Sequence, residues 1–136
     1  MTTKLQVGDH WHLEMTWTQA QVDAFAELTG DHNPIHHDAA YAATTPFKRP
    51  IMHGMLSASV FSRILGTDFP GAGTIYLGQS LTFKAPMYVD TAYSVRLEIT
   101  ALDPERHRAT LRTQITSPEG KVTLSGEASV LHRERF

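Results

Sequence analysis

The chain has 136 residues, carries a formal net charge of −2 and contains no cysteine. This length predicts one domain over residues 1–136 with a substantial core. The charge balance leaves no basic surplus for nucleic acid, and the lack of cysteine excludes disulfides and thiolate metal ligands. The N-terminus lacks a signal-peptide pattern, and no apolar run approaches the about 20 residues of a membrane span. We therefore expect a cytoplasmic protein without membrane association.

A strand is expected around residues 5–15, and a helix follows from Thr18. Thr18 and Gln21 have the spacing of a capping box, apolar residues then recur on one helical face, and Gly30 is placed to end the helix. The segment DHNPIHHD, residues 31–38, is therefore predicted to be the loop that leaves this helix.

Within this loop, Pro34 is incompatible with simple helical continuation and pushes Asn33 toward an extended conformation. Asp38 is placed to cap a short helix in DAAYAAT. The segment IMHGMLSASVFSRILG comes next, with a helix expected to begin near Gly54 and to stop at Gly66. Its apolar residues lie around most of the helical circumference, which predicts a buried helix.

After residue 73 the apolar period becomes two, which indicates strands. Four strands, each with one apolar face, are expected within residues 75–83, 93–99, 109–115 and 122–130. DPER and SPEG supply turns between the last three. A buried helix followed by these strands predicts an α+β fold, in which an antiparallel β-sheet wraps around a long central α-helix.

The two aspartates and three histidines of residues 31–38 are consistent with a metal site, an acid–base site or a solvated polar loop. No metal is expected, because the spacing is not the two-histidine, one-turn arrangement of a metallohydrolase helix and Pro34 breaks such a helix. Gly54 favours the acid–base site, since a glycine at a helix start leaves backbone N–H groups unobstructed where the dipole is positive. A carboxylate–imidazole pair that holds water beside a polarised carbonyl suits hydration of an α,β-unsaturated thioester.

The stretches GDHNPIH and HGM, followed by a long apolar helix, resemble the MaoC-like hydratases of the hot-dog fold. More narrowly, the chain is similar to the short (R)-specific enoyl-CoA hydratases that supply monomers for polyhydroxyalkanoate synthesis. The likeness covers nearly the whole chain, including ATTPFKRPIMHGMLSASVFSRILG and GTIYLGQSLTFKAP. It implies a homodimer with active sites at or near the subunit interface. It also implies no cofactor, since coenzyme A is part of the substrate.

Carried over residue by residue, the resemblance implies that Asp31 and His36 are catalytic and that the Gly54 amide binds the thioester oxygen. Asn33 would orient the loop of the substrate site, and Ser62 would line that site. Each residue has a structural alternative. Asp31 could serve only a turn, His36 only the core, Gly54 only close packing, and the Ser62 hydroxyl could bond to its own helix.

Two further residues are predicted to lie in the substrate site. His53 adjoins the helix start, where its position suits a contact with substrate or a packing role. Leu65, together with Ser62 and Val130, is predicted to form the floor of the acyl pocket, whose depth would set the preferred chain length.

The predicted function is reversible hydration of a trans-2-enoyl-CoA to the (R)-3-hydroxyacyl-CoA, with an acyl-CoA thioester as the partner. The alternatives are a (3R)-hydroxyacyl-acyl-carrier-protein dehydratase, a thioesterase of the same fold and a non-catalytic acyl-CoA-binding subunit. Asp31 and His36 together argue against a binding-only protein. The pair titrates as a unit, and His36 is the favoured base because the ordinary pKa of histidine lies near neutrality.

Overall fold

The computed structural model describes residues 3–136. Its strands are β1 (His10–Met15), β2 (Ile75–Gln79), β3 (Thr82–Phe83), β4 (Tyr93–Asp103), β5 (Arg108–Thr116) and β6 (Val122–Leu131). Its α-helices are α1 (Gln19–Thr29), α2 (Ala39–Ala43) and α3 (Gly54–Arg63). Short helical turns lie at Pro34–His36, Ile64–Asp68 and Pro104–Arg106.

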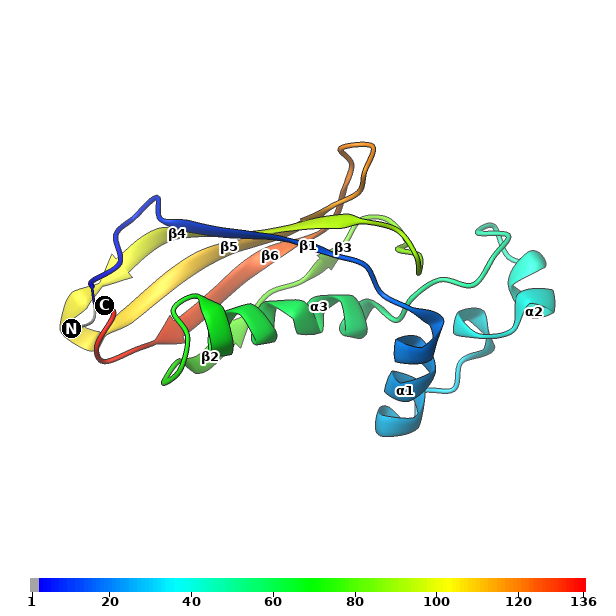
Figure 1. Cartoon of the computed structure of the whole chain (residues 1–136), viewed down its shortest axis with the longest axis horizontal. Helices are drawn as coiled ribbons and strands as arrows, with labels where there is room; N and C mark the ends of the chain where they lie inside the picture. Colours follow the sequence, from blue (N-terminus) through cyan, green and yellow to red (C-terminus); the bar gives the residue numbers. More distant parts are fainter. Residues whose placement is uncertain (1–2) are drawn as a thin grey trace.

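All strand pairs are antiparallel, in the order β1-β4-β5-β6-β2, and β3 also pairs with β6. Helix α3 runs along one face of this sheet, while α1 and α2 lie beyond its N-terminal end (Figure 1). A single antiparallel sheet around a central helix is the hot-dog fold, so the predicted fold is confirmed.

The core forms where the inward face of the sheet meets α3. Along β4 every second side chain is buried, from Tyr93 to Ile99, because successive side chains of a strand point to opposite faces. Val60 and Phe61 of α3 and Ile64 of the following turn are buried against that face. This contact holds the start of α3 at a fixed position relative to the sheet.

The first predicted strand of the sheet that follows α3 differs from expectation. It is divided into β2 and β3, and its alternating residues Ile75, Leu77 and Phe83 are 53%, 43% and 51% exposed. Among the described residues β2 is an edge strand that pairs with β6, and the space between it and α3 is a cavity instead of packed core. The expected strand thus forms in two parts, and of its apolar face Leu81 packs against the core within a single chain. The N-terminal strand also begins later than expected, at His10, after a turn at Gly8.

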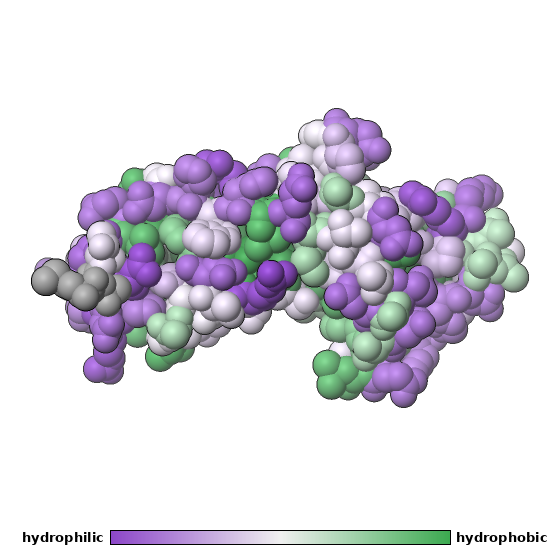
Figure 2. Space-filling view, viewed as in Figure 1, coloured by the Kyte–Doolittle hydropathy of each residue, from purple (hydrophilic) through white to green (hydrophobic). Residues whose placement is uncertain are grey.

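Helix α3 begins at Gly54, as predicted, and changes to a π-helical turn before Gly66. Four of its ten residues, Ser57, Ala58, Val60 and Phe61, are buried, whereas Met55, Ser59, Ser62 and Arg63 are exposed, so the prediction of burial on nearly all sides is wrong. None of the helices within residues 3–136 is long and apolar enough to cross a membrane. The face drawn in Figure 2 is mainly hydrophilic, with apolar side chains in separate groups.

Candidate active site at the start of the central helix

Helix α1 delivers the aspartate of the site. The hydroxyl of Thr18 accepts a hydrogen bond from the Gln21 amide at 3.2 Å, and the Gln21 side chain accepts one from the Thr18 amide at 2.9 Å. This capping box was predicted and is confirmed. At the other end, Gly30 adopts φ +80°, a conformation that favours glycine, and turns the chain out of the helix directly before Asp31.

The loop after Asp31 is held by its own polar side chains. A carboxylate oxygen of Asp31 accepts a hydrogen bond from the Asn33 amide at 3.2 Å, and the Asn33 side chain accepts one from the Ile35 amide at 3.2 Å. The latter bond caps the short turn Pro34–His36. Asn33 thus holds the turn through the backbone, and its part in the substrate site stays a prediction.

The ring of His36 is oriented by the segment before α3. Its Nδ1 lies 2.7 Å from the Ile51 carbonyl oxygen, which only accepts, so Nδ1 carries the proton. In the neutral ring Nε2 is then unprotonated, and among residues 3–136 it has no hydrogen-bond partner. Burial lowers the pKa of His36 below its ordinary value, although the bond to Ile51 opposes this shift. His36 is therefore a neutral base with a free lone pair.

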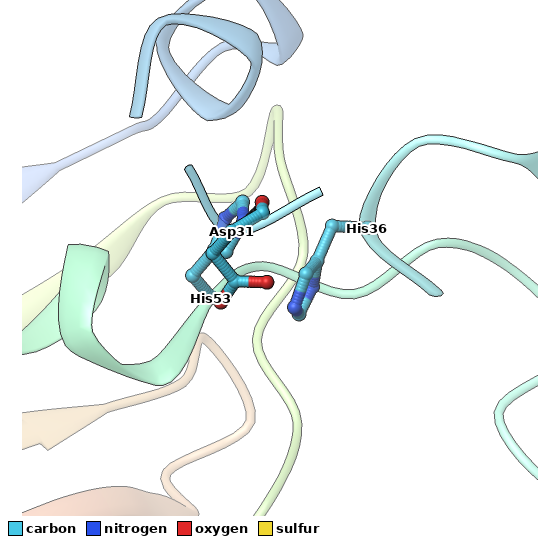
Figure 3. A group of neighbouring side chains, drawn as sticks. All are labelled: Asp31, His36 and His53. Atoms are coloured by element: carbon cyan, nitrogen blue, oxygen red, sulfur yellow. Dashed lines mark hydrogen bonds between the residues drawn. The ribbon is translucent and has the colours of Figure 1, made fainter. Parts of the chain in front are cut away.

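Asp31, His36 and His53 come together from two segments of the chain, as Figure 3 shows. One nitrogen or carboxylate oxygen from each lies within 4.8 Å of the others. Two hydrogen bonds of about 2.8 Å reach that far, so one water molecule can bridge the carboxylate and the imidazole. The negative charge of Asp31 also favours the protonated form of His36.

These three side chains are also the donor set of a possible metal site, and their geometry argues for a different use. The rings of His36 and His53 are tilted against each other, with centroids 3.8 Å apart and planes inclined by 30°. The Nδ1 of His36 and the Nε2 of His53 are each used on a backbone carbonyl oxygen, whereas a tetrahedral zinc site needs ligand lone pairs that converge on one point. The absence of a metal stays a prediction.

Gly54 supplies the helix start. Within residues 3–136 the amides of Gly54 and Met55 have no acceptor, as expected in the first turn of a helix. A Cβ atom at Gly54 would lie 2.6 Å from the ring of Phe83, so only glycine allows this approach. Free amides at a positive helix end suit a carbonyl oxygen that gains charge.

A cavity of about 520 Å³ opens beside His36 and Gly54, and Asp31 is not among its lining residues. His36 and Gly54 line it together with mainly apolar side chains, and Lys84 contributes a charged group. Its size is that of a small-molecule site. Ser57, three residues into α3, lines this cavity although the sequence analysis did not identify it. The sequence contained a signal for it, because Ser57 lies three residues after Gly54 and helical residues three apart share a face.

The remaining predicted residues lie elsewhere. Ser62 lines a second cavity of about 420 Å³ between α3 and β2, and Met55 lines both cavities. Leu65 is buried in the core. His53 lies behind the wall of the first cavity and is not among its lining residues.

Comparisons with known proteins agree with this geometry. A family model described as a MaoC-like domain matches residues 5–120. The chain is 49% identical to an (R)-specific enoyl-CoA hydratase of Aeromonas caviae over 126 residues, 93% of this chain and 94% of that protein.

Two solved structures are similar over nearly the whole chain. One is an (R)-hydratase of A. caviae involved in PHA biosynthesis, with a TM-score of 0.91, 48% identity, and coverage of 94% of this chain and 97% of the other. The second is an R-hydratase of Pseudomonas aeruginosa, with a TM-score of 0.90, 40% identity, and coverage of 96% and 84%. From the family model, the sequence identity and the shared fold, it follows that this chain belongs to the MaoC-like family.

Proposed function

We propose that the protein is an (R)-specific enoyl-CoA hydratase, which adds water reversibly to a trans-2-enoyl-CoA. The observation that carries the proposal is the free Nε2 on the ring of His36, which has a nitrogen within 4.8 Å of an Asp31 carboxylate oxygen and lines one cavity with Gly54. The named activity of the A. caviae relative, at 49% identity, supports the substrate class and the (R) product.

The reaction begins with the thioester oxygen on the Gly54 amide, which draws electrons from the β-carbon. Water lies between Asp31, which accepts one of its protons in a hydrogen bond, and His36, which removes the other. The oxygen bonds to the β-carbon as the double-bond electrons move toward the thioester, which gives an enolate held at the helix start.

The enolate then collapses as its α-carbon takes a proton from the same side, from the His36 imidazolium. The thioester carbonyl is restored and His36 returns to its neutral form, so one water has been added in total. The thioester itself accepts the electron pair, and these steps need no metal or redox cofactor.

We also propose a homodimer, formed through the edge strand β2. Ile75 and Leu77 expose apolar surface on this edge, which also has backbone groups free to pair. A partner on this edge would cover the second cavity. An acyl chain could then extend along α3, past Met55, toward Ser62. The cytoplasmic location remains a prediction.

The test is the loss of the enoyl-thioester absorbance when the purified protein meets crotonyl-CoA. Asp31→Asn keeps the shape of the side chain and removes its charge, so kcat should fall by about 10²- to 10⁴-fold. His32→Gln is the matched control, since His32 is an exposed residue of the same loop.

Rapid hydration by the native protein and the control, with chiral analysis giving the (R) product, is the expected result. No hydration of crotonyl-CoA or of a longer enoyl-CoA would overturn the proposal. Activity with a 3-hydroxyacyl-acyl carrier protein alone would then identify the dehydratase alternative.

A further inference from the structure

His53 connects the parts of the site without facing the cavity. It is the residue directly before α3, it is 2% exposed, and its side chain makes no bond that caps the helix. Its ring packs between Phe25 of α1, with centroids 4.9 Å apart, and His36, with centroids 3.8 Å apart. His53 therefore contacts both α1, which leads to Asp31, and the ring of His36, so it touches the surroundings of both proposed catalytic residues.

The hydrogen bonds of His53 identify its tautomer. Its Nε2 lies 3.1 Å from the backbone carbonyl oxygen of Asp31, which only accepts, so Nε2 donates. Its Nδ1 is buried and has no partner within residues 3–136. The tautomer with its proton on Nε2 makes this bond, whereas an Nδ1–H tautomer would bury a donor without an acceptor.

We infer that His53 is a positioning residue for the hydratase reaction, whose ring holds the Asp31 backbone and the His36 ring at a fixed distance from the start of α3. This inference rests on the proposed function. We prefer this role to the substrate contact considered from the sequence. The Nε2–H group of the His53 ring is already bonded, and the residue is not among those that line the cavity.

The position needs a histidine because it needs two properties at once. A flat ring is required to stack on His36, and one N–H donor is required at the ring edge to reach the Asp31 carbonyl oxygen. Phenylalanine supplies the ring without the donor, and glutamine supplies a donor without the ring. These two substitutions therefore separate the two contacts.

The titratable and charged groups around His36 determine the pH dependence that we expect for kcat/KM. Asp31 and His37 lie on its own loop, His53 faces it from the segment before α3, and Lys84 lines the shared cavity. Loss of the His53 ring would admit water to His36 and relieve its burial, the main cause of its lowered pKa. The acid limb of kcat/KM should then move to higher pH.

The experiment compares His53→Phe and His53→Gln with the native full-length protein, and His32→Gln is the control. We measure kcat and KM with crotonyl-CoA, the pH profile and thermal unfolding. His53→Phe should lower kcat by about 10- to 100-fold with little change in KM, as expected when a reacting group is misplaced. His53→Gln should also lower kcat and move the acid limb upward.

Nitrogen NMR of the native protein identifies the tautomer of His53 without a substitution that could unfold the protein. His53 should show the Nε2–H tautomer, because its Nε2 lies 3.1 Å from the Asp31 carbonyl oxygen. An Nδ1–H tautomer, or folded variants with native kcat and pH profile, would overturn the inference. Activity of the native protein, lost in Asp31→Asn, would still leave the proposed function standing.

Discussion

The two ends of the molecule each hold a histidine ring that is bonded to the backbone, and the rings differ in what they leave free. Near the C-terminus, at the end of the molecule far from α1 (Figure 1), His132 is 6% exposed. Its Nε2 donates to the Ala72 carbonyl oxygen at 2.8 Å, and its Nδ1 accepts from the amides of Glu134 and Arg135 at 3.2 Å. Both nitrogens are thus in use.

At the other end, His36 uses one nitrogen for the backbone and leaves the second with its lone pair toward a cavity. The difference teaches how a structural histidine is separated from a reactive one. Burial alone does not separate them, because His132 is more buried than His36. The separating property is an unbonded nitrogen on a ring that lines a cavity, since the unbonded Nδ1 of His53 is buried and His53 does not line the cavity.

Matched leucine substitutions at His36 and His132 give the largest expected effects. His36→Leu removes the base, so kcat should fall by about 10²- to 10⁴-fold, while the free energy of unfolding should fall by about 1 kcal/mol for one lost hydrogen bond. His132→Leu should lower that free energy by about 2–4 kcal/mol, because three backbone groups lose a buried partner. Its kcat should stay near the native value.

Urea unfolding and the crotonyl-CoA assay, run on the same preparations, measure both effects. The comparison fails if His132→Leu loses activity while it remains folded, or if His36→Leu loses stability and keeps its turnover.

Much of the fold was readable from local pattern. The capping box at Thr18, the left-handed Gly30 and the start of α3 at Gly54 follow from residues that satisfy nearby backbone groups. The exposure of Ile75 and Leu77 could not be predicted, because their alternation indicates only a strand with one apolar face. Whether another part of the protein covers that face depends on the order of strands in the sheet.

The candidate site also has some features that the sequence predicted and others that it could not predict. Asp31, His36 and Gly54 were predicted from residue type, spacing and resemblance. The structure places Asp31 and His36 in one cluster, and His36 and Gly54 in the lining of one cavity that Asp31 does not line. The carbonyl acceptor of Ile51 was not predictable, because any residue provides that backbone oxygen. The separation of Ser62 from the His36 cavity depends on side-chain packing along α3, which sequence spacing does not resolve.

Gly54→Ala tests the glycine requirement with an intermediate expected effect. The new Cβ would lie 2.6 Å from the Phe83 ring, so the ring or the helix start must move. We expect kcat/KM to fall by about 10- to 100-fold, because a displaced helix start would misplace the amide proposed to hold the thioester oxygen. Phe83→Leu in the same chain removes the ring and should restore much of the loss. A Gly54→Ala loss that Phe83→Leu leaves unchanged would exclude this contact as its cause.

The smallest expected effect is a displacement of the pH profile. Burial lowers the pKa of His36 from its ordinary 6.5, so the active neutral base persists below that pH and is lost as pH falls through the lowered pKa. The plateau of kcat/KM should therefore extend below pH 6.5, with an acid limb that belongs to the Asp31–His36 pair.

Phe47→Ala opens the cavity wall and relieves burial of His36, so its acid limb should lie at higher pH than the native one. Leu28→Ala, at an 85% exposed position of α1 outside the cavity lining, is the matched control and should retain the native limb. A native limb in Phe47→Ala would mean that the cavity wall does not set the basicity of His36.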